Sequence, residues 1–321
     1  MQRTVLSIII CGLLFIFLTS IAYAERIMFT TGPSAGGWYP TGAGMSEIIM
    51  NEIPGLNITV KEGGGVGNIR EVSSNRAQLG YTFSNTFNDA LNGKEPFKNK
   101  VENISGFLTL YFSYYQAIVH DNSNIESYHD LYDKDIAPGR RNWSGEILTR
   151  RILESYDLSY DKIKEEGGKI SYIGFSDMTM QMRDKNIDAA MGCTAAPSSF
   201  IMDLMSTHDI RFLEVDKNNA ESIMNKYAGY DYKTMPANTY ANQNEPVKTL
   251  GTYTIITIRK DLSEEFVYNM TKAVMENLDE YHKVHPVAKN LTIDSALNAF
   301  PDMKMVHPGV VKYFKEIDKL D

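Results

Sequence analysis

From residue 25 onward, short runs of apolar and β-branched residues alternate with longer stretches in which apolar positions recur every three or four residues. The short runs predict buried strands and the longer stretches predict amphipathic helices. In the first third of the chain we expect strands at 27–30, 57–61 and 78–83, and helices at 42–53 and 67–74. This order predicts an α/β fold with largely parallel strands.

The same pattern returns later in the chain, after an aromatic run at 106–119 that is long enough to leave one domain and enter another. A second β run at 249–258 follows a loop at 227–246 that is rich in Tyr, Asn and Pro. This β run is predicted to be the strand that crosses back into the first domain. The remaining elements expected between and after the crossings are strands at 135–138, 169–174, 189–193 and 210–215, and helices at 146–156, 177–185, 264–282, 295–300 and 310–317.

Two α/β regions joined by two β crossings predict a two-lobed clamshell. Residues 25–116 and 250–321 are expected to form lobe 1, and residues 117–249 lobe 2. In open α/β sheets, ligands bind beyond the carboxyl ends of the strands. We therefore expect the functional residues in the turns that follow the strands.

Composition fits two ordinary globular domains, because the 321 residues are 43% hydrophobic and 22% charged. The chain has 32 basic and 40 acidic residues, a net charge of -8, and the sequence has no concentrated block of Lys and Arg. Nucleic-acid binding needs such a basic face, so the composition disfavours it.

Residues 1–24 have the features of a secretory signal peptide: Arg3, an apolar run at 5–18, and the cleavage pattern Ala22-Tyr23-Ala24. An uncleaved anchor is the alternative. Cleavage leaves Cys193 as the one cysteine, which excludes an intrachain disulfide and a cysteine metal site. We expect an exported protein that works in a bacterial periplasm without a metal or cofactor.

The first glycine-rich turn, 30–42, connects a strand to a helix that we expect to begin near Pro40. Glycines allow close approach of the backbone to a ligand, and a helix N-terminus attracts anions. Trp38 and Tyr39 supply flat apolar walls. We predict ligand contacts from this turn, although it is also compatible with a simple tight connection; the predicted residues are Ser34, Gly37, Trp38 and Tyr39.

Two further turns of lobe 1 show similar features. In the segment 62–70 we predict ligand contacts from Gly64 and Asn68, although Asn68 is equally suited to cap the helix, and Arg70 in the first turn favours a carboxylate partner. The spacing does not fit a dinucleotide loop, so we do not expect NAD. After the strand at 78–83, three short polar side chains can bind a ligand or cap the next helix: Ser84, Asn85 and Thr86.

In lobe 2, the turn 138–146 combines two guanidinium groups with a helix N-terminus, which favours anion binding. We expect one of the two arginines, and not both, to face the cleft. The predicted contacts are Arg140, Arg141, Asn142, Trp143 and Ser144. The turn 193–199 adds Thr194 and Ala195, with a buried Cys193 before a Pro-initiated helix as the structural alternative.

Catalysis has one candidate, the G-x-S-x-G pattern at 32–36 with His307 downstream, which would make Ser34 the nucleophile of a secreted serine hydrolase. That strand is the first of the mature chain, so no earlier loop supplies the second oxyanion-hole amide. His282 and His285 lie one helical turn apart, but we interpret them as helix-terminal caps and not as metal ligands.

The chain resembles the TAXI family of solute receptors for TRAP transporters over nearly all of its mature length. The resemblance is carried by 31–40, 64–68, 77–80, 110–111, 150–153, 277–278, 285–286 and 307–309. It implies a type II periplasmic binding protein, no catalysis, and delivery of an organic acid such as glutamate, a dicarboxylate or a keto acid to a fused membrane permease. The family's usual Gly-Ser-Gly-Thr turn after Gly139 is replaced here by Asn142-Trp143-Ser144-Gly145.

These observations predict a monomeric receptor that closes on a small anionic metabolite. Trp38, Tyr39, Tyr111 or Trp143 would pack against the carbon skeleton of the ligand. If Arg141 pairs with the anion, removing its side chain weakens binding by at least about tenfold. A receptor-like sensor domain that acts through a separate partner is a further alternative.

Overall fold

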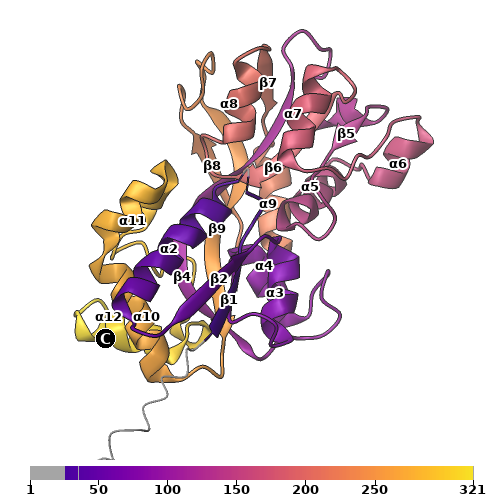
Figure 1. Ribbon diagram of the computed structural model, residues 1–321. Helices are drawn as coiled ribbons and strands as arrows, with labels where there is room; N and C mark the ends of the chain where they lie inside the picture. Colours follow the sequence, from indigo (N-terminus) through magenta and orange to yellow (C-terminus); the bar gives the residue numbers. More distant parts are fainter. Residues whose placement is uncertain (1–25, 35, 321) are drawn as a thin grey trace, which may run out of the picture.

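The computed structural model describes residues 26–34 and 36–320. Two α/β lobes, lower and upper in Figure 1, are joined by long strands that run through both. The predicted signal peptide lies outside the described residues. No helix within the described ranges is long and apolar enough to span a membrane.

The strands in chain order are β1 (Arg26–Thr30), β2 (Asn57–Lys61), β3 (Leu79–Phe83), β4 (Ile104–His120), β5 (Ile136–Ala137), β6 (Ala189–Thr194), β7 (Ile210–Leu213), β8 (Asp231–Met235) and β9 (Val247–Arg259). The helices are α2 (Trp38–Glu52), α3 (Gly65–Ser73), α4 (Ser84–Asn92), α5 (Ser144–Ser155), α6 (Tyr160–Glu165), α7 (Phe175–Arg183), α8 (Ser199–Met205), α9 (Lys217–Lys226), α10 (Glu264–Glu276), α11 (Leu278–Val284) and α12 (Pro308–Glu316). Short 3-10 helices lie at Tyr128–Leu131, Pro286–Asn290 and Met303–Met305.

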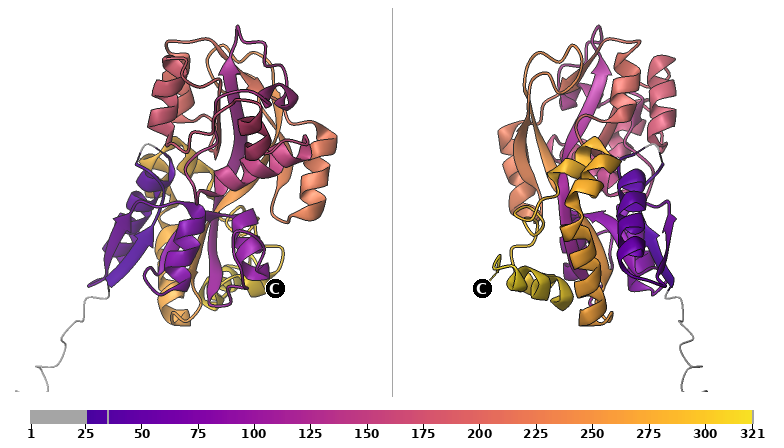
Figure 2. Two further views of the ribbon diagram at one scale, coloured as in Figure 1. Left: turned by 90° about the vertical axis from the view of Figure 1, so that its right-hand side faces the viewer. Right: turned by 60° about the vertical axis from the view of Figure 1, so that its left-hand side comes forward.

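One mixed sheet continues through both lobes, in the order β2-β1-β3-β9-β4-β6-β5, with β7 beside β4 and β8 beside β9. The antiparallel pair β4 and β9 forms the two crossings, as the two side views in Figure 2 show. Strand β9 pairs with β8 up to Gly251 and with β3 from Thr254, whereas β4 pairs with β6 from Tyr114. We call lobe 1 the part built on β1–β3 and lobe 2 the part built on β5–β8.

Burial explains why these segments form their elements. All five residues of β3 are buried, as expected for a strand covered on both faces. In α10, the apolar positions Val267, Met270 and Val274 are fully buried and form one face of the helix. The turns that follow β1, β2 and β3 in lobe 1, and β5 and β6 in lobe 2, are thereby brought to the space between the lobes.

Several predicted elements differ from the structure. The segment 169–174 is not a strand: it makes a single bridge, Ile170 to Ile136, because the neighbouring strand β5 has only two residues. The segment 295–300 forms turns and not a helix. The predicted loop 227–246 contains β8, which pairs antiparallel with β9.

The helix predicted at 264–282 is divided into α10 and α11 at Asn277. The side-chain amide of Asn277 donates to the Ala273 carbonyl at 2.9 Å. This bond offers the backbone an alternative to continued helix, which is the usual reason that Asn disfavours helix interiors. The apolar periodicity continues through the break and therefore did not reveal it.

Candidate functional site

A cavity of about 50 Å³ lies between the glycine-rich turns of the two lobes. The turns after β1 and β2 form its lobe 1 side, and the turns after β5 and β6 with the start of α7 form its lobe 2 side. The lining residues are Pro33, Gly36, Gly37, Trp38, Gly63, Gly64, Gly65, Phe83, Pro138, Gly139, Trp143, Ser144, Gly145, Glu146, Phe175, Met191, Gly192, Cys193 and Thr194. We call this space the inter-lobe cavity.

Two helices begin at the inter-lobe cavity, one from each lobe. Helix α3 begins at Gly65 and α5 begins at Ser144. Within the described residues, no side chain caps either N-terminus, and α3 has no acidic residue in its first turn. The first amides of a helix have no partner inside it and carry partial positive charge. The cavity therefore offers N–H groups from both lobes to an anion.

Two buried hydroxyl groups, Ser144 Oγ and Thr82 Oγ1, have no hydrogen-bond partner in the described part of the chain. They come from different lobes and converge at Gly65. A side-chain carbon at Gly65 would clash with Ser144 Oγ and lie 3.2 Å from Thr82 Oγ1. Because buried polar groups are almost always hydrogen-bonded, these hydroxyls are available to bond a polar ligand atom or a water molecule.

Aromatic rings form the apolar walls of the inter-lobe cavity. Trp38 packs edge-on against Phe83, with centroids 4.9 Å apart, and its indole N–H donates to Thr254 Oγ1 at 3.2 Å. Trp143 packs against Phe175 at 5.0 Å. A side-chain carbon at Gly64 would come within 2.5 Å of Trp143 Cδ1, so the indole of lobe 2 lies directly on the backbone of lobe 1.

Among the described lining residues, Glu146 and Cys193 are the acidic ones, and the lining contains no Lys, Arg or His. Burial raises the pKa of the Glu146 carboxyl, although Arg150 Nε donates to its Oε1 at 3.1 Å and opposes the shift. Burial also raises the pKa of the Cys193 thiol, which therefore stays protonated at neutral pH. The attraction for an anion comes from backbone amides and hydroxyls.

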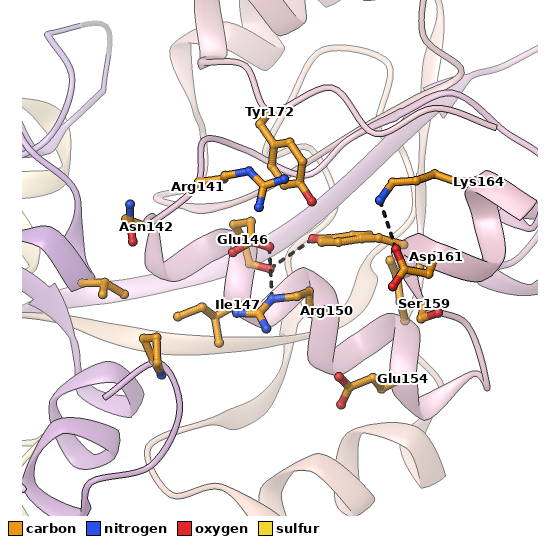
Figure 3. A pocket seen from close by; sticks show the side chains of 14 residues that line it. Arg141, Asn142, Glu146, Ile147, Arg150, Glu154, Ser159, Asp161, Lys164 and Tyr172 are labelled. Atoms are coloured by element: carbon orange, nitrogen blue, oxygen red, sulfur yellow. Dashed lines mark hydrogen bonds and ion pairs between the residues drawn. The ribbon is translucent and has the colours of Figure 1, made fainter. Parts of the chain in front are cut away.

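A larger hollow of about 610 Å³ opens beside the inter-lobe cavity, between α5, α6 and the lobe 1 residues Val66 and Pro96. Its charged groups are largely engaged with one another (Figure 3): Arg150 contacts Glu146, and Lys164 contacts Asp161, at 3.1 Å each. We call this space the side hollow. Glu146 belongs to the walls of both spaces.

The two arginines of the turn 138–146 do not line the inter-lobe cavity. Arg141 faces the side hollow, where its guanidinium stacks on Tyr172 at 3.9 Å (Figure 3). Arg140 lies 3.8 Å from the Asp177 carboxylate and is mostly exposed. Asn142 also lines the side hollow, and its Oδ1 accepts a bond from Arg70 across the lobes at 3.0 Å.

The first turn contributes Gly37 and Trp38 to the inter-lobe cavity, whereas Ser34 is exposed and faces a groove beside α7 and α8. The Ser34 N–H donates to Glu62 Oε1 at 2.8 Å, and hydrogen bonds from Ser34 lower the pKa of the Glu62 carboxyl. Tyr39 is not among the lining residues. Pro40 is the third residue of α2 and not the first, because Gly37 already has helical angles.

Asn68 is inside α3 and not at its N-cap. Its side-chain amide donates to the Thr31 and Tyr81 carbonyls at 2.6 and 2.8 Å, and its Oδ1 accepts from Gly64 N–H at 3.2 Å. All of these bonds hold α3 against the ends of β1 and β3. Asn68 therefore positions the turn and its amides, and its side chain is already engaged. Arg70 contacts Asn142, not a carboxylate.

Polar side chains at the start of α4 make hydrogen bonds between the lobes. Ser84 Oγ donates to the Gly229 carbonyl at 3.0 Å, and the Asn85 amide donates to Tyr230 OH at 2.8 Å. Ser84, Asn85 and Thr86 are buried and do not line the inter-lobe cavity. Tyr111 and Ala195 are likewise buried outside the lining.

Of the predicted contact residues, the structure brings Gly37, Trp38, Gly64, Trp143, Ser144 and Thr194 together around one cavity. Sequence reasoning missed Thr82, Glu146 and Phe175. Thr82 lies within the predicted strand 78–83, and Phe175 follows the segment wrongly predicted to be a strand. An aromatic residue at a helix start, after the glycine at 174, was the available signal for Phe175.

The arrangement does not support a serine hydrolase. His307 caps α12: its Nδ1 accepts from Gly309 N–H at 3.2 Å, and its Nε2 lies 3.1 Å from the Leu262 carbonyl. Both ring nitrogens are thus engaged in lobe 1, so His307 does not serve Ser34 as a base. His285 caps the 3-10 helix that follows it, by accepting from Val287 N–H.

Comparison with known proteins identifies the fold. The sequence model of the NMT1-like family matches residues 29–317. The structure of the periplasmic binding protein BugD aligns with a TM-score of 0.56 and 12% identity, over 92% of this chain and 98% of that chain. A structure on glutathione import through GshT and the cystine importer TcyBC of Streptococcus mutans aligns with a TM-score of 0.50 and 11% identity, over 88% and 99%. The predicted two-lobed fold of type II periplasmic binding proteins is confirmed.

Proposed function

The chain belongs to the NMT1-like family, and on that premise we propose that it is a periplasmic solute-binding receptor. It captures a small organic anion in the inter-lobe cavity and delivers it to a membrane transporter. The fold supports this function, because the neighbours of known structure include a periplasmic binding protein and a component of glutathione import.

One observation carries the proposal of an anionic ligand. The N-termini of α3 and α5 meet at a cavity lined by Ser144, and beside it, at Gly65, the hydroxyls of Ser144 and Thr82 have no partner in the described part of the chain. An anion here accepts bonds from both lobes at once. Binding therefore favours the closed arrangement of the lobes over an open one, which is the population shift that a transporter can recognise.

The transporter that receives the solute is, in this proposal, a TRAP permease of the TAXI type, and the solute is an organic acid of the glutamate, dicarboxylate or keto-acid class. This finer assignment is supported by the resemblance of the turn 31–40 and of the segments 64–68 and 307–309 to that family. An importer of the ABC type is the competing partner, given the neighbours of known structure.

The same cavity argues for binding without chemical change. The candidate nucleophile on the wall of the cavity is Ser144 Oγ. The ionisable side chains among the described lining residues are Glu146 and Cys193, and Glu146 is already bonded to Arg150. A serine nucleophile needs a free base within hydrogen-bond reach. We therefore assign Ser144 to ligand binding and assign no catalytic residue.

A matched pair of glycine substitutions tests the site. In Gly65→Ala, the added methyl group occupies the place between Ser144 Oγ and Thr82 Oγ1. In Gly67→Ala, on the same helix, the added methyl group meets no heavy atom within 4 Å. Neither change removes a backbone N–H group, and both remove a glycine that helices disfavour.

Thermal shift and calorimetry with acetate, propionate, pyruvate, succinate, glutamate and methanesulfonate provide the measurement. A ligand present at 100 times its Kd stabilises the wild type by about 2.7 kcal/mol. We expect Gly65→Ala to weaken the binding of that ligand by at least about thirtyfold, and Gly67→Ala to change it by less than about threefold. Equal binding by wild type and Gly65→Ala would refute the site. If none of these anions binds, the anion receptor itself is refuted.

A further inference from the structure

We infer that the inter-lobe cavity selects a small monoanion with an apolar body, a short-chain monocarboxylate or alkanesulfonate, over amino acids and dicarboxylates. This inference rests on the proposed receptor function; of the organic acids proposed above it retains those with a single charge and excludes glutamate and the dicarboxylates. The small volume of the cavity, the charges on its wall and the position of Trp143 support it.

The cavity is small, at about 50 Å³. Acetate, propionate and methanesulfonate suit such a space better than succinate and glutamate, which have about twice as many non-hydrogen atoms.

The charges on the wall limit the ligand further. An anionic head is accommodated by the helix N-termini and by the hydroxyls at Gly65. A second charged group has no complement, because the described lining contains no basic side chain and its carboxylate, Glu146, is already bonded to Arg150. Burying an unpaired carboxylate or ammonium group is strongly unfavourable.

The rest of the wall is suited to hydrocarbon. Trp38, Phe83, Trp143, Phe175 and Met191 surround the space beyond the helix N-termini. An alkyl tail placed there removes apolar surface from water, at about 25 cal/mol for each Å² buried. An ammonium group placed there loses its hydration and gains no partner. The walls thus favour a methyl group over an ammonium group of the same size.

Trp143 limits the length of the ligand that the cavity can hold. Its indole extends from lobe 2 onto Gly64 of lobe 1 and packs against Phe175, so it occupies space that a longer ligand would need. Trp143 is the N-cap residue of α5 and makes no side-chain cap bond. Shortening this side chain therefore enlarges the cavity while the helix start is retained.

Propionate and glycine form a matched pair of probes, because they differ mainly by a methyl group in place of an ammonium group. Calorimetry on the wild-type protein should show propionate and methanesulfonate binding at least about tenfold more tightly than glycine, succinate or glutamate. Glycine, succinate or glutamate binding as tightly as propionate would overturn the inference.

The Trp143→Ala variant tests the length limit. We expect its preference to move from propionate to hexanoate by at least about tenfold in the ratio of the two Kd values, and Trp143→Phe to show a smaller move in the same direction. An unchanged ratio in a Trp143→Ala protein with native circular dichroism would overturn the role of Trp143.

The outcomes separate this inference from the function on which it rests. If glutamate or succinate binds most tightly and Gly65→Ala abolishes that binding, the receptor function stands and the selectivity inference fails. If no carboxylate or sulfonate binds the wild type, both fail.

Discussion

A buried ion pair joins the two lobes, and removing one of its partners should destabilise the protein strongly. Arg151 of α5 in lobe 2 donates to Asp89 Oδ2 of α4 in lobe 1 at 2.8 Å, and the two side chains are 5% and 2% exposed. The same guanidinium donates to Tyr230 OH at 2.9 Å and stacks on Tyr227 at 3.7 Å. The Asp89→Asn substitution removes the negative charge and leaves the guanidinium buried.

The magnitude follows from the burial. Breaking a buried pair by removing one partner costs about 3–5 kcal/mol, because a charge is left without compensation. A second pair between the same helical regions is the control: Arg150 Nη1 lies 2.6 Å from Glu95 Oε1, but the Glu95 side chain is 76% exposed. Exposed pairs contribute about 0–1 kcal/mol, so Glu95→Gln should have little effect.

Denaturant unfolding of the mature protein measures the change in the free energy of unfolding for each variant. This change is the shift in the unfolding midpoint multiplied by the slope of the free energy against denaturant concentration. We expect Asp89→Asn to lower the free energy of unfolding by about 3–5 kcal/mol and Glu95→Gln to lower it by under about 1 kcal/mol. The double variant Asp89→Leu/Arg151→Met should recover much of the loss, because replacing both partners by apolar groups removes the buried charge. Equal losses in Asp89→Asn and Glu95→Gln would refute the reasoning.

Three further predictions concern the inter-lobe cavity. Arg141→Ala should change anion affinity by less than about threefold in calorimetry, because Arg141 stacks on Tyr172 outside the cavity. A loss of about tenfold, as the sequence predicts, would instead show that Arg141 binds the anion. Burial raises the pKa of the Glu146 carboxyl, so this group loses its negative charge, and anion affinity rises, as the pH falls through the raised pKa. The Glu146→Gln variant should bind the anion about threefold or more tightly at neutral pH, and its affinity should not depend on pH. Weaker binding by this variant would contradict the prediction. The buried Cys193 thiol, whose pKa burial also raises, should resist a thiol reagent in the native protein and react on unfolding; rapid native labelling would contradict the closed cavity.

The meeting of the glycine-rich turns could be predicted from the sequence. Turns after successive strands lie at one edge of an α/β sheet, and Gly37, Gly64 and Ser144 lie around one cavity. Strand periodicity fixes where each turn begins, and the topology then brings the turns together.

The direction of individual side chains could not be predicted in the same way. Asn142 has a φ of +69°, a left-handed conformation that separates the direction of Arg141 from that of Trp143. Arg141 consequently faces the side hollow, and Trp143 faces the inter-lobe cavity. Asn68 is a residue type that often contacts ligands, but its side chain is already bonded to three backbone groups, those of Thr31, Gly64 and Tyr81. Such competition depends on tertiary contacts that spacing does not show.

The most direct test of the anion site is the change in backbone amide chemical shifts when isotopically labelled protein is titrated with propionate. The first amides of α3 and α5, at Gly65, Val66, Ser144 and Gly145, should show the largest and saturable shifts, because they point at the bound carboxylate. Large shifts confined to the side hollow around Tyr172, with the two helix starts unchanged, would contradict the account.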